Sequence, residues 1–292
     1  MGSVTIRVPG TSANIGPGFD SLGCAFNIYN MLTFAHAATT TVTGCPAAYA
    51  NEDNLALVAF RAACRRAGRE ACPVSLHIET NVPVSRGLGS SATLFVGGAM
   101  GANELLSLGL SKTDIFEIAN ELEGHPDNAA PATFGGFTAC LVENGHPYAT
   151  SVPVSPTLHF CALVPDFELT TSRARSVLPP TVPFADAVHN GTHVAVLLSA
   201  LREGDTALLS LALSDRLHEP YRRPLIAGLE VAEREALSLG AHAFFISGSG
   251  STCMAVYTDE SFPAAMTARM AALLPAWRVL PLKLDSEGAV SL

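Results

Sequence analysis

Short stretches in which apolar and polar residues alternate predict β-strands in the first half of the chain. Val4–Val8 and Val74–Thr80 alternate in this way, and Asn27–Thr43, rich in Thr and Phe, is also typical of a strand. Phe134–Val142 predicts a further strand. The first half of the chain therefore contains several strands, which alternate with the helices described next.

Apolar and small residues at helical spacing predict the helices of this half. Leu55–Arg66 has such a spacing, with Asp53 or Asn54 as the N-cap. Ala92–Leu108 is a long segment of small residues, and Ser111–Glu123 opens with a capping-box signature. Three helices are therefore expected before residue 124.

The second half predicts a separate α+β domain, because composition shifts near Asn144–Pro147. Its expected elements are strand Leu158–Val164, helices Thr171–Leu178, Ala185–Leu201, Ala207–Leu217 and Leu225–Leu237, strands Ala241–Ile246 and Cys253–Tyr257, helix Phe262–Leu274 and strand Trp277–Leu284. We therefore expect two domains, residues 1–147 and residues 148–292.

Composition and charge exclude some classes of partner. A hydrophobic content of 48% and a charged content of 15% are typical of a compact globular protein. The net charge of −9 argues against non-specific binding to nucleic acid or to an anionic membrane. Lys112 and Lys283 are the only lysines, so an essential cation in a site is expected to be arginine or a metal ion.

The seven cysteines indicate a reducing compartment. Their number is odd, and no two are spaced as C-x-x-C, so we expect reduced core thiols in a cytoplasmic protein. The N-terminus lacks the pattern of a signal peptide. The uncharged run between Arg86 and Glu104 is rich in Gly, Ser and Ala, which favours a packed helix over a membrane span.

A glycine- and serine-rich loop joins one predicted strand to the small-residue helix. The segment Pro83–Thr93 lies between strand Val74–Thr80 and helix Ala92–Leu108. The first N–H groups of a helix lack partners, and the helix dipole favours negative charge there. Gly87 and Gly89 let the backbone approach a ligand, so the loop predicts a phosphate-binding site.

This loop matches neither of two familiar phosphate-binding motifs. No lysine follows Gly89, as a Walker A motif requires, and Ala92 stands where a dinucleotide fingerprint has its third glycine. Taken alone, the loop fits equally well a turn that only connects a strand to a helix.

A second turn-rich segment, Pro9–Gly23, favours a binding loop. It contains Ser12, Asn14 and Asp20, which are more hydrogen-bonding side chains than a simple turn needs.

A third cluster follows the last helix of the first half. Glu123, His125, Asp127 and Asn128 fall within six residues between two apolar elements. They form either a solvated helix end or a group of partly buried side chains. Buried carboxylates need partners, and such clusters are candidates for functional sites.

Three glycine-rich segments, each at the end of a predicted strand, resemble the signature of the GHMP kinase superfamily. They are Pro9–Gly23, Gly87–Thr93 and Gly248–Thr252. The resemblance covers essentially the whole chain and is closest to the branch that phosphorylates L-homoserine. The motifs that carry it are Pro9-Gly-Thr-Ser-Ala-Asn14, Gly16-Pro-Gly-Phe-Asp20, Arg86-Gly-Leu-Gly-Ser-Ser-Ala92 and Glu121-Leu-Glu-Gly-His-Pro-Asp-Asn128. Ser251 replaces a proline that is usual in the third segment, and Thr93 replaces a usual alanine.

The resemblance implies an α+β, two-domain GHMP kinase fold. The N-terminal domain would be similar to the second domain of ribosomal protein S5, the C-terminal domain would be ferredoxin-like, and the active site would lie between them. The implied reaction is ATP-dependent phosphorylation of L-homoserine to O-phospho-L-homoserine in threonine biosynthesis. ATP and L-homoserine would be the partners, with Mg²⁺ as cofactor, and the resemblance leaves a homodimer open.

The same resemblance assigns residues to ATP and to the metal. Those expected around ATP are Pro83, Arg86, Gly87, Leu88, Gly89, Ser90, Ser91, Ala92 and Thr93. Asn54 is either a helix cap, the more ordinary interpretation, or a contact to the nucleotide. Ser91 and Glu123 are the expected Mg²⁺ ligands, since this ion prefers hard oxygen donors.

The resemblance further implies that Asp127 and Glu123 are the catalytic residues. Phosphoryl transfer itself depends mainly on positioning and charge neutralisation. Asp127 would lie near the reacting hydroxyl, either as a general base or only to orient the substrate.

The resemblance also assigns residues to the acceptor amino acid. Asn14, Asp20 and Asn128 would accept hydrogen bonds from its ammonium group. Its carboxylate suits the two-pronged guanidinium of Arg175 or Arg222. A single arginine is usually a surface charge, but two that match motif contexts favour a carboxylate site. His125 is expected to line the same pocket, or to form a hydrogen bond only with the backbone at its helix end.

Two other functions stay open on the sequence. The chain could be a GHMP kinase for a different small alcohol, although an acceptor without a carboxylate would not need two arginines. It could also be a GHMP-fold protein that binds a nucleotide without catalysis. Such a protein is expected to have lost Glu123, Asp127 or a loop glycine, and all of these are present.

Overall fold

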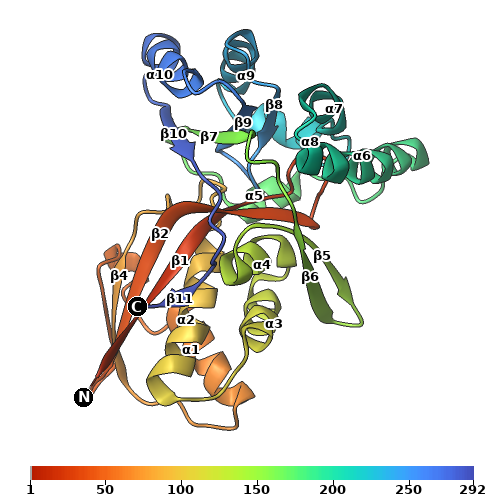
Figure 1. Cartoon of the computed structure of the whole chain (residues 1–292). Coiled ribbons are helices and arrows are strands. Elements are labelled where there is room, and N and C mark those ends of the chain that lie inside the picture. The colour runs from red at the N-terminus through yellow and green to blue at the C-terminus, as the bar shows by residue number, and fades with distance from the viewer. Residues whose placement is uncertain (1) are drawn as a thin grey trace.

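Residues 2–292 form two β-sheets with helices packed against them, in a computed structural model of the chain (Figure 1). The first sheet has the order β11-β1-β2-β4-β3, and a hairpin of β5 and β6 joins it where β5 pairs with β2. Only the pair β3–β4 is parallel among the described strands. The strands are β1 (Ser3–Ala13), β2 (Leu22–His36), β3 (Thr41–Thr43), β4 (Val74–Glu79), β5 (Phe137–Glu143), β6 (His146–Val152) and β11 (Val290–Ser291).

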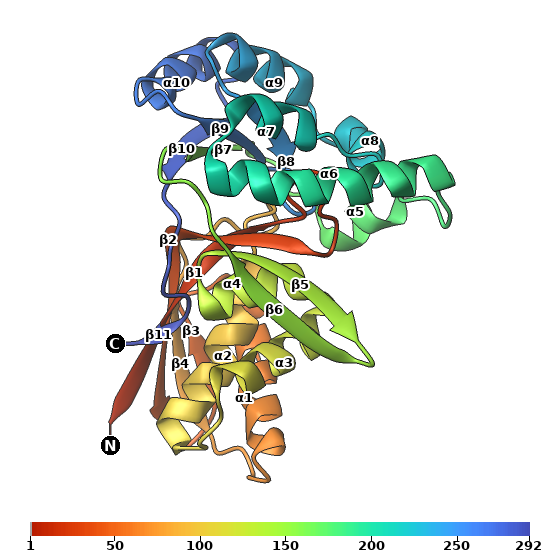
Figure 2. The same cartoon turned by 45° about the vertical axis from the view of Figure 1, so that its right-hand side comes forward.

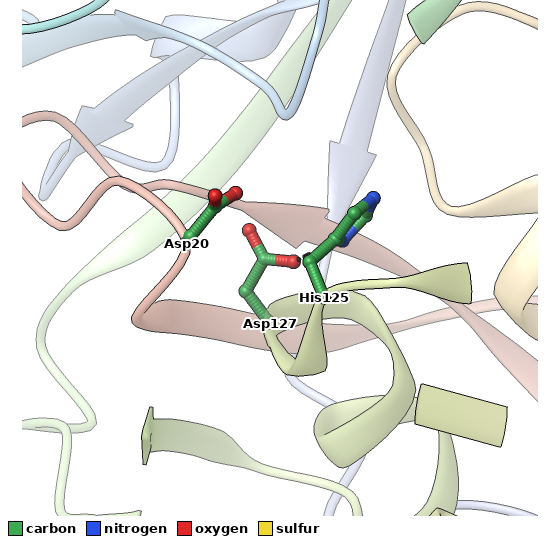
Figure 3. Close-up of side chains that lie close together, drawn as sticks. All are labelled: Asp20, His125 and Asp127. Atoms are coloured by element: carbon green, nitrogen blue, oxygen red, sulfur yellow. Dashed lines mark hydrogen bonds and ion pairs between the residues drawn. The ribbon is translucent and has the colours of Figure 1, made fainter. Parts of the chain in front are cut away.

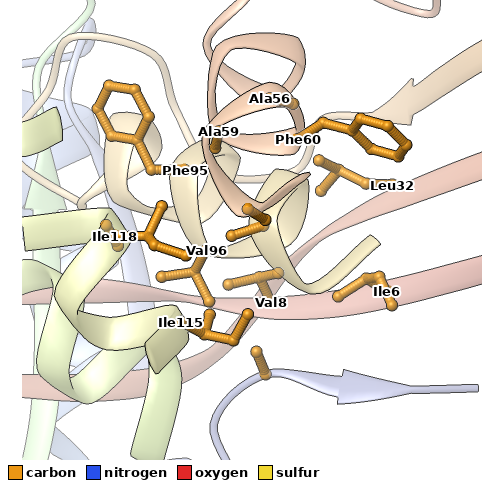
Figure 4. Packing of buried hydrophobic residues seen from close by; sticks show 14 of the residues in the cluster. Ile6, Val8, Leu32, Ala56, Ala59, Phe60, Phe95, Val96, Ile115 and Ile118 are labelled. Atoms are coloured by element: carbon orange, nitrogen blue, oxygen red, sulfur yellow. The ribbon is translucent and has the colours of Figure 1, made fainter. Parts of the chain in front are cut away.

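Four helices cover one face of the first sheet (Figure 1). They are α1 (Leu55–Arg66), α2 (Ser90–Leu106), α3 (Lys112–Glu123) and α4 (Pro126–Phe134). Their apolar faces and the sheet share one core, in which Phe60, Val96, Ile115 and Val8 are buried (Figure 4). Burial of this apolar surface holds the helices in place, and so fixes the loops at their ends. The short 3₁₀ helix η1 (Ala47–Tyr49) lies between β3 and α1.

The second sheet has the order β10-β7-β9-β8, and every neighbouring pair is antiparallel. Its strands are β7 (His159–Val164), β8 (Ala243–Ile246), β9 (Cys253–Tyr257) and β10 (Arg278–Leu282). This order, with helices between β7 and β8 and between β9 and β10, is the ferredoxin-like arrangement. The helices of this half are α5 (Thr171–Ser176), α6 (Phe184–Glu203), α7 (Thr206–Ala212), α8 (Glu219–Arg222), η2 (Arg223–Leu225), α9 (Leu229–Ser238) and α10 (Phe262–Leu273). The α+β, two-domain architecture is therefore as predicted.

The chain passes from the first sheet to the second between β6 and β7. β6 pairs with β5 as far as Val152, so residue 147 lies within a strand of the first sheet. The C-terminal end then returns to the first sheet, because β11 pairs with β1 (Figure 2). We propose that the first domain comprises residues 2–152 together with the last residues of the chain.

Most predicted helices and strands are confirmed to within a few residues. Asn54 is the N-cap of α1, and Ser111 and Asp114 form the capping box of α3. The helix expected over Ala207–Leu217 is shorter, because α7 ends at Ala212. Among residues 2–292, no helix is both long enough and apolar enough to cross a membrane.

Two expectations are wrong in part. Pro9–Gly23 is not a single loop, because β1 continues to Ala13 and a bulge between Pro9 and Gly10 accommodates the proline. Helix α4 was not predicted, and the strand expected over Phe134–Val142 begins later, at Phe137, because Phe134 ends this helix. Pro126 stands at its first turn, where its missing N–H costs nothing, and Pro131 lies inside it.

Gly23 sets the distance between β2 and the first turn of α4. A Cβ atom at this position would lie 1.8 Å from the backbone oxygen of Asp127. We therefore expect Gly23→Ala to push α4 away and to lower the free energy of unfolding by about 1–3 kcal/mol, the usual cost of overpacking. Thermal and denaturant unfolding measure this change.

Gly191→Ala is the matched control. Gly191 lies in α6, and a Cβ there would meet no atom within 4 Å. Alanine is favoured over glycine in a helix, so this variant should be about 0.5–1 kcal/mol more stable. Equal effects of the two substitutions would contradict the steric interpretation of Gly23.

Candidate active site

A pocket of about 600 Å³ lies between the two sheets. Residues of both halves line it: Asn14, Asp20, Ser91 and Asp127 come from the first half, and Arg175 from the second. The pocket is continuous from the N-terminus of α2 to this cluster of charged side chains. It therefore has room for two ligands that meet.

The three glycine-rich segments converge at this pocket. The hydroxyl of Ser247 donates to the backbone oxygen of Gly87 at 2.5 Å and shares a hydrogen bond of 2.8 Å with Ser12 Oγ. A Cβ at Gly87, where φ is +75°, would lie 2.2 Å from the backbone oxygen of Ser247. Asn14 Nδ2 donates to the backbone oxygen of Gly248 at 2.8 Å. Segments that are far apart in sequence are thus joined by close packing of Gly87 against Ser247 and by hydrogen bonds from side chains.

The N-terminus of α2 opens onto this pocket. Gly89 is its N-cap, in a left-handed conformation, and no side chain caps the helix. Gly87, Gly89, Ser90 and Ser91 line the pocket. The first N–H groups of a 17-residue helix and its dipole therefore face the cavity, an arrangement that attracts anions.

Glu123, at the end of α3, is held beside this helix terminus. Ser91 Oγ donates to Glu123 Oε1 at 2.6 Å. Glu123 Oε2 is buried without a hydrogen-bond partner among residues 2–292. Burial raises the pKa of Glu123, and the hydrogen bond from Ser91 opposes this rise only in part. A buried carboxylate oxygen with no partner fits a divalent cation, which would favour the ionised form of the carboxylate.

His125, Asp127 and Asp20 form a second polar cluster (Figure 3). His125 Nδ1 is 2.7 Å from Asp127 Oδ1, and one ligand-type atom of each of the three residues lies within 4.8 Å of the others. Burial would lower the pKa of His125, but the hydrogen bond and charge of Asp127, with the charge of Glu123, raise it. Both oxygens of Asp20 are already bonded to Arg175, whereas Glu123 Oε2 has no partner among residues 2–292. Glu123 therefore suits a metal ion better than this second cluster does.

Arg175 and Arg222 lie at the same end of the pocket, and the guanidinium groups of both contact the ring of Phe19. Arg222 is almost fully buried, and it donates from Nε to the backbone oxygen of Ala174 and from Nη1 to that of Gly248. Burial and the charge of Arg175 lower the pKa of Arg222 to about 10, so it stays cationic at neutral pH.

Several expected ligand-binding side chains are occupied by bonds within the protein. Asn54 accepts from Ala56 N and donates to the backbone oxygen of Tyr49, as a helix cap does. Asn14 Oδ1 accepts from Asp20 N, and Asn128 Oδ1 accepts from Thr11 Oγ1 at 2.7 Å. All three asparagines line the pocket, and these bonds help to hold its wall, while their contacts to a ligand stay predictions.

Arg86 also lines the pocket, but its guanidinium points to backbone carbonyls. It donates to the oxygens of Val84, Pro165 and Asp166, and so ties the phosphate loop to the second half. These bonds anchor the loop, and the direct contact between Arg86 and ATP stays a prediction.

Four of the residues expected around ATP do not line the pocket: Pro83, Leu88, Ala92 and Thr93. Leu88 and Ala92 are fully buried in the cores. Thr93 is buried too, and its hydroxyl accepts from Asn30 Nδ2 and donates to the backbone oxygen of Ser90. The side chains of Leu88, Ala92 and Thr93 pack into the protein on the side of the loop away from the pocket, and so support the loop.

One end of the pocket is apolar and was not predicted from the sequence. Cys45, Tyr49 and Leu55 line it together with Ile78 and Leu94. Tyr49 belongs to η1, and no motif or periodicity in residues 44–51 predicts a binding surface. Gly248 and Ser249 also line the pocket, and their segment, Gly248–Thr252, had been recognised only as a motif.

Family profiles match both halves of the chain. The profile described as "GHMP kinases N terminal domain" matches residues 54–136, and that described as "GHMP kinases C terminal" matches residues 197–276. Together with the uncapped helix terminus at a two-domain pocket, these matches define the class: the chain is a member of the GHMP kinases.

Comparison with individual proteins places the chain more closely within the GHMP kinases. The chain is 40% identical over 290 residues to a homoserine kinase of Clostridium botulinum, with 98% of each chain covered. It is 43% identical over 268 residues to a homoserine kinase of Thermosynechococcus vestitus, covering 90% of this chain and 89% of that one. A crystal structure of homoserine kinase from Cytophaga hutchinsonii superposes with a TM-score of 0.89 at 27% identity, covering 99% and 97% of the two chains. The chain belongs to the homoserine kinase family.

Glu219, at the start of α8, is a buried carboxyl group whose pKa can be tested through the stability of the protein. Its Oε1 accepts from Ile246 N at 2.9 Å, and burial raises its pKa from 4.5 to about 8. The folded state thus binds the proton more tightly than the unfolded chain. This contribution to stability is complete below about pH 4.5 and is lost as the pH rises through about 8.

Glu219→Gln removes this dependence, because the amide stays neutral. Between pH 6 and pH 9 the free energy of unfolding of the variant, relative to the natural protein, should rise by about 2–3 kcal/mol. Denaturant unfolding at both pH values measures this difference. Glu230→Gln, at an exposed position of α9, is the control and should show no such trend. A difference between Glu219→Gln and the natural protein that is constant with pH would show that Glu219 is charged throughout.

Proposed function

We propose that this chain transfers the γ-phosphoryl group of ATP to the side-chain hydroxyl of L-homoserine. The observation that carries the proposal is the single pocket that joins the uncapped N-terminus of α2 to a cluster of two carboxylates and two arginines. The first end suits a triphosphate, and the second suits an amino-acid zwitterion. The homoserine kinases to which the chain is similar support the same acceptor.

In this proposal, ATP lies along the pocket. Its phosphates accept hydrogen bonds from the N–H groups of the loop Gly87–Ser91, and the adenine packs at the apolar end against Tyr49, Leu55 and Leu94. The reacting phosphorus would then lie between the N-termini of α2 and α4. Asp127 stands in the first turn of α4 and is almost fully buried.

Ser91 and Glu123 would hold Mg²⁺. The orphan Oε2 of Glu123 and the hydroxyl of Ser91 are hard oxygen donors beside the phosphate loop, as this ion requires. When bound, Mg²⁺ neutralises charge on the β- and γ-phosphates. Ser91 and Glu123 also keep each other in position, through their mutual hydrogen bond.

The acceptor would lie between Asp20 and the two arginines. Its ammonium pairs with Asp20, and its carboxylate takes Arg175 and the remaining Nη2 of Arg222. Its hydroxyl donates to Asp127, the oxygen forms a bond to the γ-phosphorus, and the bond from that phosphorus to ADP breaks. The proton of the hydroxyl passes to Asp127 or to solvent, so Asp127 acts as a base or orients the hydroxyl.

We also propose a cytoplasmic location. All seven cysteines have free thiols, and those at positions 24, 64, 140, 161 and 253 are buried. A reducing compartment keeps such thiols free.

The deciding experiment is ADP release from Mg²⁺-ATP with a panel of acceptors: L-homoserine, D-homoserine, mevalonate, shikimate and galactose. Turnover with L-homoserine alone is expected, because only this compound presents both charges and the hydroxyl in the required arrangement. Turnover confined to another alcohol would replace the proposed acceptor. ATP binding without turnover on any acceptor would favour a non-catalytic protein.

Two isosteric substitutions separate the roles of Asp127 and Asp20. Asp127→Asn should lower kcat by about 100-fold or more, because it removes an acceptor for the reacting hydroxyl. Asp20→Asn should act mainly on KM for L-homoserine, since this carboxylate contacts the ammonium and not the reacting atoms. Steady-state kinetics at saturating ATP measures both. A kcat near the natural value for Asp127→Asn would remove Asp127 from the reaction.

Glu123→Gln tests the metal site. The Mg²⁺ concentration for half-maximal rate should rise by about an order of magnitude, because an amide oxygen is a weaker ligand than a carboxylate. Glu121→Gln is the control on the same helix, where the carboxylate is exposed and pairs with Arg66. If both variants need the same Mg²⁺ concentration as the natural protein, Glu123 is not a ligand.

A further inference from the structure

Asp20 and Arg175 form a bidentate ion pair inside the pocket. Arg175 Nη2 donates to Asp20 Oδ1 at 2.6 Å, and Nη1 donates to Asp20 Oδ2 at 3.1 Å. Asp20 belongs to the loop between β1 and β2, and Arg175 belongs to α5, so the pair spans the two halves of the molecule. Both side chains are about one third exposed, at 35% and 38%, and both line the pocket. They are thus accessible to a ligand.

This pair carries the two charges that an amino-acid ligand also carries. An α-amino acid presents one carboxylate and one ammonium group, and the pair presents one carboxylate and one guanidinium. The neighbouring charged groups have other partners: Arg222 bonds to two backbone oxygens, and Asp127 bonds to His125. In the ligand-free protein the charges of Asp20 and Arg175 are paired with each other, so a ligand that pairs fully with either group competes with the bond between them.

We propose that a zwitterionic acceptor binds by exchanging partners with this ion pair, and that the exchange selects against acceptors with only one of the two charges. The ammonium group of the substrate binds Asp20, and the carboxylate of the substrate binds Arg175. One ion pair within the protein is thus replaced by two ion pairs with the ligand. A ligand with one charge breaks the same pair but leaves Asp20 or Arg175 without a partner. The inference rests on the proposed function, since it concerns the acceptor of that reaction.

The halves of the molecule need not separate for this exchange. Contacts that do not involve Arg175 also join them, among them the bond from Ser247 to Gly87 and that from Asn14 to the backbone oxygen of Gly248. Asp20 is held by its own backbone N–H, which donates to Asn14 Oδ1 at 3.0 Å. The exchange therefore requires rotation of the Arg175 side chain and leaves the wall of the pocket intact.

If Asp20 and Arg175 compete with the ligand for each other, removing one of them should strengthen binding of a ligand to the other. Two side chains that bind the ligand independently would not show this gain. Asp20→Asn frees Arg175, so it should bind 4-hydroxybutanoate, which has only the carboxylate, about two- to fivefold more tightly than the natural protein does. Arg175→Gln should show the same gain for 3-aminopropan-1-ol, which has only the ammonium. These factors correspond to the range measured for ion pairs that are open to water. Calorimetric titration of the full chain with each compound gives the dissociation constants.

Two controls isolate the ion pair. Asp127→Asn removes a negative charge from the same pocket without freeing Arg175, so its gain for 4-hydroxybutanoate should be smaller than that of Asp20→Asn. Asp186→Asn breaks the ion pair with Arg216 outside the pocket and should change neither dissociation constant. Equal gains for the Asp20 and Asp127 variants would assign the effect to net charge, and an unchanged or weaker affinity in Asp20→Asn would also overturn the exchange.

A second measurement decides the question if the analogues bind too weakly for calorimetry. A double-mutant cycle of Asp20→Asn and Arg175→Gln on unfolding of the ligand-free protein should show coupling between the two side chains. Coupling of zero would overturn the proposal. Turnover of L-homoserine by the natural protein tests the proposed function separately, so failure of the exchange and failure of the function give different results.

Discussion

The close contact between Gly87 and Ser247 determines how the two halves of the molecule meet. The backbone of Ser247 occupies the space that a side chain at position 87 would need, and the Ser247 hydroxyl bonds to the Gly87 oxygen. The neighbouring oxygen of Gly248 accepts from Asn14 of the first half and from Arg222 of the second. These hydrogen bonds run from side chains to main-chain oxygens, so they hold the loop Gly87–Ser91 in place relative to the end of the pocket that contains Arg222. The distance between the two proposed substrates follows from this contact.

Most of the fold could be predicted from local pattern, and the exceptions share one cause. Helices α1 and α3 follow from apolar spacing and caps, since Asn54 and Ser111 begin them as expected. Helix α4 and the end of β1 were missed, because Pro131 and Pro9 oppose these structures locally. Tertiary contacts decide both cases: α4 packs against β2, and β1 pairs along its whole length with β2. The residues next to Pro9 and Pro131 in the sequence do not reveal these partners, which are distant along the chain.

The sequence could predict which residues lie around the pocket. It could not predict which of their hydrogen-bonding atoms are already bonded within the protein. The motifs singled out the loop Gly87–Ser91 and the cluster around Asp127, and residues of both line the pocket. Sequence identifies the donors and acceptors of a side chain, whereas the fold decides which of them the protein itself uses. Asn54 and Arg86 use theirs within the protein, while Glu123 retains an unpaired oxygen. That difference separates a side chain that supports the wall from one that can hold an ion.

The distribution of cationic side chains explains why the proposed reaction would depend on a metal ion. Among the pocket-lining residues, the side chains with a permanent positive charge are Arg86, Arg175 and Arg222. Arg86 is bound to backbone carbonyls, and the other two lie at the acceptor end. The chain has only two lysines, and neither lines the pocket. The N–H groups of α2 can bind the phosphates, but they carry only partial charges. In a protein with a net charge of −9, the proposed Mg²⁺ ion would add a full positive charge beside the γ-phosphate, and Glu123 is the pocket carboxylate with an oxygen that lacks a partner among residues 2–292.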